Sequence, residues 1–164
     1  RHFGVSNQNP MMMELLKTAV KQPLKVNQLQ LSAAFTPSFE AGFHVNMEGP
    51  KAAVRDGSVF EYCRLTDTVI QAWSVLQHGY FKGNFVGKEE FAALNHVLND
   101  LAKKYQVTPT AIALAWVLRY PGKMQAVIGT TKPQHVLEAG KAAAVTLTRK
   151  EWYQIYLAAG NDLP

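Results

Sequence analysis

The sequence predicts an α/β fold, in which a parallel β-sheet is covered by helices. Four short apolar runs alternate with segments of helical periodicity along the 164 residues. A hydrophobic fraction of 48% with 18% charged residues is typical of a folded domain, either complete or part of a larger one. Polar or hydroxyl residues follow three of the four runs, and parallel α/β folds bind ligands at such strand ends. The same pattern therefore predicts the fold class and the position of a site.

The first two strands are expected over residues 2–5 and 25–31. The first is an apolar run that ends at Ser6-Asn7, and the second alternates apolar and polar residues with a period of two. Between them, Asn9-Pro10 is typical of an N-cap followed by proline at the first helical position, which predicts a helix over about 10–20. One side of this helix carries Leu15, Leu16 and Ala19.

Residues 33–55 show no sustained periodicity and contain two prolines and two glycines, so we expect a long excursion of a kind that is often functional. It forms either one wall of a substrate pocket or a loop anchored by its aromatic residues, Phe35, Phe39, Phe43 and His44. A short helix is expected to begin near residues 56–58 and to run through Arg64. The apolar run 68–73 then predicts the third strand, which ends at Ser74.

Two helices and a fourth strand–helix unit follow. Apolar residues recur at spacings of three and four from Phe91 to Tyr105, and Thr108-Pro109 begins a second helix that ends near Arg119. The fourth strand is expected over 124–128 and its helix over 133 to about 142. Thr148 and Glu151 form a capping box that opens the last helix, which closes at Gly160. The apolar face of this last helix carries Trp152, Ile155, Tyr156 and Ala159.

Four strand–helix units are too few to close a (β/α)8 barrel, which needs eight. They suffice for a small open, doubly wound sheet. However, the chain opens with a predicted strand at its second residue and does not begin with methionine. This start suggests that the sequence begins partway through a fold.

Composition and charge argue against several classes of protein. The net charge of +5 is carried by basic residues scattered singly, which favours a solvated surface with one anion-binding patch over a nucleic-acid interface. No run of eighteen apolar residues could cross a membrane. The five histidines lack metal-ligand spacing, so no metal site is expected. The single cysteine, Cys63, excludes an internal disulfide and favours a cytoplasmic location.

The segment Ile128–Pro133 is the most informative for function. Its predicted strand ends in small and hydroxyl residues directly before a helix start. The first N–H groups of a helix lack intrahelical acceptors and lie at the positive end of the helix dipole, so this end binds anions, phosphate above all. The segment therefore predicts a site for a nucleotide cofactor.

Four motifs, in this order, resemble one known family: FGVSN at 3–7, VNQ at 26–28, QAWS at 71–74 and IGTT at 128–131. Together with the ending LTRKEWY at 147–153, they resemble the C-terminal half of the aldo-keto reductases, over essentially all 164 residues. The likeness is nearest to bacterial reductases with a short C-terminal tail. It implies that residues 1–164 supply about the last four βα units and a C-terminal helix of a (β/α)8 barrel, and that the whole enzyme reduces aldehydes or ketones with NADPH.

The resemblance implies roles at the nicotinamide end of the cofactor. Amide and hydroxyl groups supply donors and acceptors without charge, which suits the nicotinamide carboxamide. Ser6, Asn7 and Gln28 would hold that group. Trp73, where the family more often has tyrosine, would stack on the nicotinamide ring.

The resemblance also implies roles at the phosphates and the adenosine. The residues that would line the pyrophosphate are Ser74, Leu76, Gln77 and Gly79. The residues that would receive the adenosine 2′-phosphate are Gly129, Thr130, Thr131, Gln134 and His135, with Glu138 near the adenine.

One departure from the family pattern bears on the choice of cofactor. His135 stands where the family usually places an arginine against the 2′-phosphate. Histidine is only fractionally charged at neutral pH, and unlike arginine it cannot donate two parallel hydrogen bonds to a phosphate group. Lys132 can supply the missing charge, so NADP is favoured and NAD is the alternative.

A second departure concerns catalysis. The family's tetrad of aspartate, tyrosine, lysine and histidine lies on the first four βα units, and this sequence matches only the last four. Residues of the right types occur in the wrong elements, at Tyr62, Asp67, His78 and Tyr80. We therefore expect no catalytic residue here, and as partners a small carbonyl substrate and the missing N-terminal barrel half or a second copy, with no nucleic acid and no membrane. The alternative is a non-catalytic, nucleotide-binding regulatory or sensor barrel.

Overall fold

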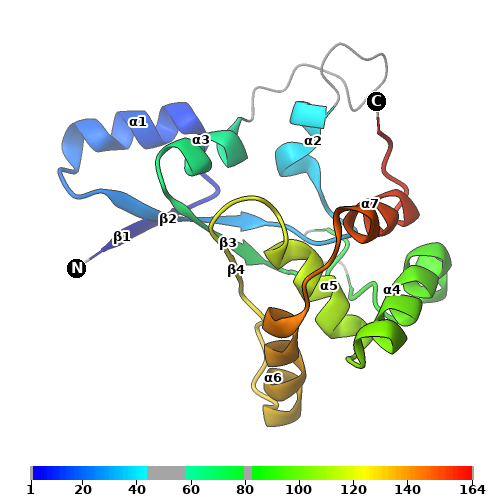
Figure 1. The fold of residues 1–164 in the computed structure, drawn as a ribbon. Coiled ribbons are helices and arrows are strands. Elements are labelled where there is room, and N and C mark those ends of the chain that lie inside the picture. Colours follow the sequence, from blue (N-terminus) through cyan, green and yellow to red (C-terminus); the bar gives the residue numbers. More distant parts are fainter. Residues whose placement is uncertain (1, 44–57, 80–82, 164) are drawn as a thin grey trace.

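The computed structural model describes residues 2–43, 58–79 and 83–163. Four parallel strands form one sheet in the order β1-β2-β3-β4, so each strand pairs with its neighbour in the sequence (Figure 1). The strands are β1 (Phe3–Ser6), β2 (Leu24–Gln30), β3 (Val69–Trp73) and β4 (Met124–Ala126). The predicted parallel sheet with helical connections is confirmed.

Helices follow each strand at nearly the predicted positions. Their bounds are α1 (Pro10–Ala19), α2 (Pro37–Phe43), α3 (Val59–Leu65), α4 (Ala92–Tyr105), α5 (Pro109–Leu118), α6 (Pro133–Gly140) and α7 (Arg149–Ala158). Short 3-10 turns precede α4 at Glu89–Phe91 and follow α6 at Lys141–Ala144. None of the described helices has the length and apolarity needed to span a membrane.

The predicted helix starts are confirmed where a side chain caps the helix. Asn9 Oδ1 accepts a hydrogen bond from the Met12 N–H at 2.9 Å, at the start of α1. Thr108 Oγ1 accepts from the Ala111 N–H at 3.2 Å, at the start of α5. The capping box of α7 is complete in both directions. These caps form between residues close in sequence, which is why the sequence predicts them.

Three expectations need correction. The excursion over 33–55 contains α2, and its residues 44–57, including His44, lie outside the described residues. The fourth strand ends at Ala126, and the chain takes a left-handed conformation at Gly129, whose φ is +54°. In α1 the buried residue is Met13, whereas Leu15 is 71% exposed.

The hydrophobic core lies on one face of the sheet and is centred on α5. Residues 111–117 of α5 are all buried, because the sheet covers one side of this helix and α4 and α7 lie near the other (Figure 1). The rings of Trp116 in α5 and Trp152 in α7 stack with centroids 4.8 Å apart. Each indole N–H also donates to the other residue's backbone carbonyl at 3.1 Å. This reciprocal pair fixes α7 on α5.

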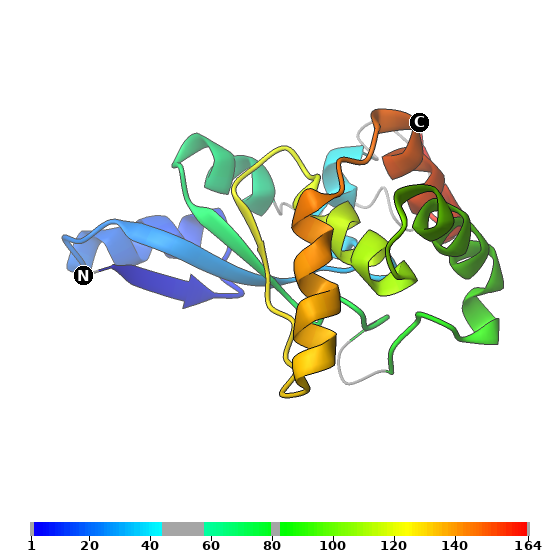
Figure 2. The ribbon, with the colours of Figure 1, turned by 60° about the horizontal axis from the view of Figure 1, so that its bottom comes forward.

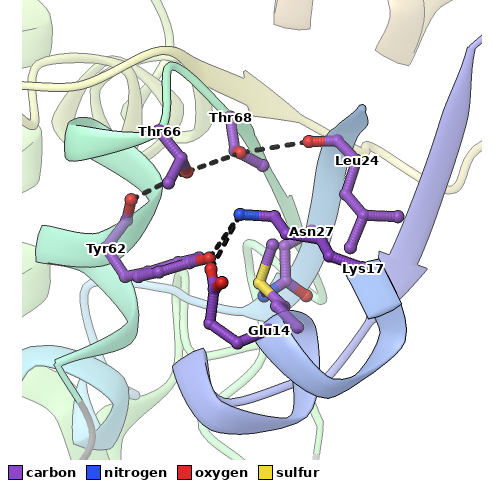
Figure 3. A network of polar contacts seen from close by, with 8 residues as sticks. Glu14, Lys17, Leu24, Asn27, Tyr62, Thr66 and Thr68 are labelled. Carbon is purple, nitrogen blue, oxygen red and sulfur yellow. Dashed lines mark hydrogen bonds and ion pairs between the residues drawn. The ribbon is translucent and has the colours of Figure 1, made fainter. Parts of the chain in front are cut away.

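A polar network joins α1 and α3 to the sheet (Figure 3). Lys17 Nζ donates to Glu14 Oε1 at 2.8 Å and to the Tyr62 hydroxyl group at 2.5 Å. The Thr66 hydroxyl donates to the Tyr62 carbonyl, and the Thr68 hydroxyl donates to the carbonyl of Leu24 in β2 at 3.1 Å. The two threonine hydroxyls lie 2.9 Å apart. The network sets how α1 and α3 lie over the first three strands.

The opposite face of the sheet is open among the described elements. In Figure 2, α1 and α3 lie on one side of β1 and β2, and no described element covers the other side. Of the side chains on this open face, Ser6 and Gln125 are exposed, and Gln28 and Gln71 are half-buried. Apolar side chains are also exposed on the helices at the two ends of the sheet, with Leu15 of α1 at 71% and Leu137 of α6 at 67%.

Candidate functional site

A row of polar side chains crosses the open face near the carboxyl ends of the strands. The strand register places Ser6, Gln28, Gln71 and Gln125 opposite one another across all four strands. Gln28 Nε2 donates to Gln71 Oε1 at 2.8 Å, and Gln71 Nε2 donates to Gln125 Oε1 at 2.9 Å. We call these three amides the glutamine row. Because each amide holds the next, the row fixes the direction in which Gln28 presents its remaining polar atoms.

Two members of the glutamine row were missed by the sequence analysis. Gln71 lies two residues before Trp73, and side chains two apart on a strand share a face, so this spacing could have found it. Gln125 follows from no local pattern, because its place opposite Gln71 depends on the register between β3 and β4.

The chain takes left-handed backbone conformations where it leaves three of the strands. The φ angles are +54° at Asn7, +52° at Ser74 and +54° at Gly129. Such conformations are strained for residues other than glycine, and they gather at functional sites. The Asn7 N–H donates to the Gln28 carbonyl at 2.8 Å, which holds the turn after β1 against β2. The sheet edge is thus shaped by sharp turns at the predicted site residues.

A buried asparagine fixes the loop after β1. Asn27, which is fully buried, donates from Nδ2 to the Gln8 carbonyl at 2.8 Å. Its Oδ1 accepts from the Gln8 N–H at 3.4 Å. The loop carrying Ser6 and Asn7 is therefore held in place from the core side of the sheet.

Trp73 ends β3 on the same face as the glutamine row. It is half-buried and lies opposite Gln30 of β2 in the strand register. The Gln30 side chain is 7% exposed, and its Nε2 has no hydrogen-bond partner among the described residues. A buried amide donor without a partner is unfavourable in a folded protein. The sheet thus places a buried amide beside the tryptophan.

The loop after β3 is held by backbone contacts. The Ser74 carbonyl accepts from the Gln77 N–H at 2.9 Å, and the Gln77 carbonyl accepts from the Ser32 hydroxyl at 2.5 Å. The Leu76 carbonyl accepts from the Phe85 N–H at 3.0 Å. Gly79 is buried with a φ of +150°. These bonds fix the main chain at Ser74, Leu76 and Gln77, three of the four residues predicted to line a pyrophosphate.

A cavity of about 250 Å³ lies between this loop and α6. It brings together four residues that the sequence analysis assigned to the phosphates and adenosine, namely Leu76, Thr130, His135 and Glu138. It also adds Asn84 and Thr110, which the sequence analysis missed because both lie far in sequence from the strand ends. The predicted residues of β1, β2 and the end of β3 do not line this cavity. They lie along the adjoining edge of the sheet.

The N-terminus of α6 faces this cavity without a side-chain cap. Its N-cap residue is Lys132, and the N–H groups of Gln134 and His135 occupy positions that have no intrahelical acceptor. Thr130 Oγ1 accepts from the Lys132 N–H at 3.2 Å and lies 3.5 Å from His135 Nδ1. The Gln134 side chain donates to Glu138 at 2.9 Å. Gly129 and Thr131 are exposed in the same turn. This end of the helix can bind an anion.

No group of three or more histidine, cysteine, aspartate or glutamate side chains within the described ranges is arranged to hold a metal ion. Burial raises the pKa of the Cys63 thiol to about 11, with a hydrogen bond from Asn27 opposing this rise and Glu61 adding to it. The thiol is therefore neutral and unreactive at physiological pH. The candidate site consists of amide, hydroxyl, aromatic and backbone groups.

Comparisons with known proteins identify the family and the fold. A model of the aldo/keto reductase family matches residues 1–158. The chain belongs to this family. Its structure is also similar to a Klebsiella pneumoniae aldo-keto reductase in complex with NADPH, with a TM-score of 0.67 at 20% identity over 94% of this chain and 46% of that one. A Giardia lamblia aldose reductase gives a TM-score of 0.65 at 18% identity, over 94% of this chain and 43% of that one. The fold is thus that of part of a (β/α)8 barrel, and the open doubly wound sheet is set aside.

The curated relatives of this aldo/keto reductase family member are oxidoreductases. A 6-dehydroglucose reductase of Agrobacterium fabrum is 32% identical over 98% of this chain and 47% of its own length. The oxidoreductase YdhF of Escherichia coli is 29% identical over 100% of this chain and 49% of its own length. The chain therefore spans about half the length of these relatives.

Proposed function

We propose that this chain is the cofactor-binding half of an oxidoreductase that reduces aldehydes or ketones to alcohols with NADPH. The observation that carries the proposal is the continuous line of binding groups along one edge of the sheet. It runs from Ser6 and Gln28, past Trp73, to the cavity at the N-terminus of α6. An extended dinucleotide needs such a line, with neutral hydrogen-bonding groups at one end and an anion site at the other.

The residues fit a nicotinamide at the β1–β3 end. The Gln28 side chain would form a hydrogen bond with the carboxamide, in the orientation that the glutamine row imposes on this side chain. The indole ring of Trp73 would position the nicotinamide by stacking. Asn7 would add a side-chain amide from a turn that is already held in place.

The residues also fit a phosphorylated adenosine at the α6 end. The N–H groups of Gln134 and His135 and the hydroxyl of Thr130 converge near one cavity. Lys132, the N-cap residue of α6, carries a positive charge at this helix start. This charge favours NADP over NAD, whose ribose has no 2′-phosphate.

When bound, NADPH would supply the hydride to the carbonyl carbon. The residues of this chain bind and orient the cofactor. By the family pattern, the group that protonates the developing alkoxide belongs to the first four βα units. We therefore infer that the N-terminal half of the barrel is the partner of this half, covering the open face of the sheet. The single buried cysteine is the basis for proposing a cytoplasmic location.

A titration of the 164-residue chain with NADPH, followed by cofactor and tryptophan fluorescence, tests the binding part of the proposal. Saturable binding is expected, and Lys132→Gln should weaken NADPH binding about fivefold or more while changing NADH binding little. Lys150→Gln, which removes the same charge at an exposed position of α7, is the matched control. Absence of binding, or equal losses in both variants, would contradict the proposal.

Turnover tests the catalytic part. The chain joined to an aldo/keto reductase N-terminal half should oxidise NADPH when an aldehyde is added, and the chain alone should not. If the joined protein binds NADPH but turns over no aldehyde or ketone, the alternative of a nucleotide-binding regulatory barrel is favoured instead.

A further inference from the structure

A second cavity, of about 330 Å³, lies at the other end of the strands. Its walls come from the end of α3, which precedes β3, from the turn between α5 and β4, and from the start of α7. These segments lie at the amino ends of the strands, whereas the candidate cofactor site lies at the carboxyl ends. Any ligand of this cavity is therefore separate from the cofactor.

Three arginines line the cavity, one from each wall: Arg64, Arg119 and Arg149. Arg119 Nε donates to the Leu147 carbonyl at 3.0 Å, which ties this side chain to the segment before α7. The Arg149 guanidinium lies over the ring of Tyr153, 5.7 Å from its centroid. The Arg64 guanidinium lies beside Tyr120, where it opposes the rise that burial causes in the pKa of that phenol. Each guanidinium is thus oriented by a separate contact and retains further N–H donors.

The positive charge of these arginines is not neutralised nearby. In the described part of the chain, none of the three forms an ion pair with a carboxylate. Glu61 is the one acidic residue that lines the cavity. Glu151 in α7 is engaged by Lys104 at 2.6 Å, on the side of α4. Three cations therefore face one anion, which leaves the cavity electropositive.

The remaining wall is aromatic and rigid. The Trp152 ring is 7% exposed and stacks on Trp116 and on Tyr156, with centroid distances of 4.8 and 5.7 Å. Tyr120 is 9% exposed, and Tyr153 packs edge-on against Trp152 at 5.1 Å. A ligand would meet flat apolar surfaces beside the guanidinium groups. Such a combination suits a molecule with one strongly anionic group and a small organic part.

We propose that this cavity binds a small phosphate monoester, whose phosphate is held by Arg119, Arg149 and Arg64. The planar guanidinium group of arginine can donate two parallel hydrogen bonds to phosphate oxygens. The volume of the cavity lies at the lower end of the range of small-molecule sites. The organic part of the ligand would contact Tyr120 and Tyr153. In (β/α)8 barrels the amino ends of the strands contribute to stability, and catalysis takes place at the carboxyl ends. Because this cavity lies at the amino ends, its ligand would act as an effector or stabiliser.

Calorimetric titration of the 164-residue chain with phenyl phosphate at low ionic strength tests the proposal, with inorganic phosphate and phenol as comparison probes. Phenyl phosphate should bind more tightly than inorganic phosphate, and phenol should not bind measurably. Arg119→Gln and Arg149→Gln should each weaken phenyl phosphate about tenfold. Thermal unfolding of each variant shows whether it remains folded, and Arg64→Gln repeats the test if Arg119→Gln disturbs the contact with Leu147.

Two control variants distinguish binding in this cavity from attraction to a nearby surface charge and from binding at the α6 end. Lys150→Gln removes a positive charge next to Arg149 but outside the cavity, and it should leave phenyl phosphate affinity unchanged. Lys132→Gln should also have no effect, since Lys132 lies at the α6 end. Equal losses in Lys150→Gln and Arg149→Gln, or loss in Lys132→Gln alone, would overturn the proposal. Arg149→Gln should bind NADPH normally, so failure here is distinguishable from failure of the proposed cofactor site.

Discussion

Gln28 illustrates how a single residue at the candidate site depends on side chains that would not touch a ligand. Its amide is bonded to Gln71, which is bonded in turn to Gln125 on the edge strand. An amide free to rotate presents donor and acceptor in either order, and an amide in a hydrogen-bonded row does not. Gln71 is therefore a positioning residue, and its contribution is open to measurement.

Gln71→Leu removes the partner of Gln28 at similar volume. We expect about a fivefold loss of NADPH affinity, corresponding to about 1 kcal/mol for one hydrogen bond. Fluorescence titration measures this loss, and Gln154→Leu at an exposed position of α7 serves as the matched control. A positioning role also predicts that Gln71→Asn, which shortens the amide, recovers little of the affinity. Unchanged affinity in Gln71→Leu would show that the row does not orient Gln28.

Trp73 contributes through its ring rather than through a hydrogen bond to the cofactor. Trp73→Ala should weaken NADPH binding by about 1–3 kcal/mol, if stacking here resembles stacking of bases on aromatic side chains. Trp73→Tyr restores the residue that the family more often carries, and it should retain most of the affinity. If Trp73→Ala binds NADPH as tightly as the unchanged chain does, the assignment of Trp73 is wrong.

At the scale of elements, α7 is joined to α4 through Glu151. This carboxylate is 6% exposed, and burial alone would raise its pKa. Hydrogen bonds from Lys104, Thr148 and Tyr105 outweigh burial and lower the pKa from 4.5 to about 2. The same carboxylate completes the capping box of α7. One side chain thus begins a helix and fastens it to its neighbour.

The lowered pKa of Glu151 makes stability depend on pH. The stabilisation is fully present above the ordinary pKa of 4.5, and it is lost as the pH falls toward 2. Glu151→Gln should lower the free energy of unfolding by about 2 kcal/mol at pH 7, after allowance for the exposed Lys104. Urea unfolding at pH 7, 5 and 3 checks this, and the difference between variant and unchanged chain should shrink at pH 3. Glu89→Gln, on an exposed turn, should show no such loss.

Elements set by local chemistry could be predicted from the sequence, and elements set by distant contacts could not. The starts of α1, α5 and α7 follow from caps within three residues of each other. By contrast, α2 forms where Phe39 is buried against Phe60 of α3, with ring centroids 5.4 Å apart. Local periodicity in the sequence does not predict such a contact.

The same distinction holds for the candidate site. Strand ends and a helix start can be found from spacing, so Thr130 and His135 of the 250 Å³ cavity could be predicted. Asn84 and Thr110 reach that cavity only because a loop and a helix from other parts of the chain lie beside α6. Lateral neighbours across the sheet, such as Gln125, likewise depend on register. The roles assigned to these residues stay predictions until cofactor binding is measured.

At the scale of the whole molecule, the open sheet face and the two apolar ends indicate where the rest of a barrel would pack. Leu15 on α1 and Leu137 on α6 are among the most exposed apolar side chains. Exposed strand edges and apolar patches promote association. A half-barrel should therefore associate with its N-terminal half or, alone, with a second copy.

Size-exclusion chromatography with light scattering tests this behaviour. The isolated chain should elute as a dimer or larger species, and Leu15→Lys with Leu137→Lys should increase the monomer fraction. Lys substitutions at the already exposed Gln22 and Gln154 control for added charge. A stable monomer of the unchanged chain at high concentration would contradict the expectation.

The order of the strands also bears on how the chain folds during synthesis. β2 pairs with β1, β3 with β2 and β4 with β3. When each of these later strands leaves the ribosome, the strand with which it pairs has already been synthesised. Within this sheet the paired strands are neighbours in the sequence, so the sheet can form one unit at a time in the direction of translation. In this open sheet, dividing the chain between two neighbouring units separates only one pair of strands.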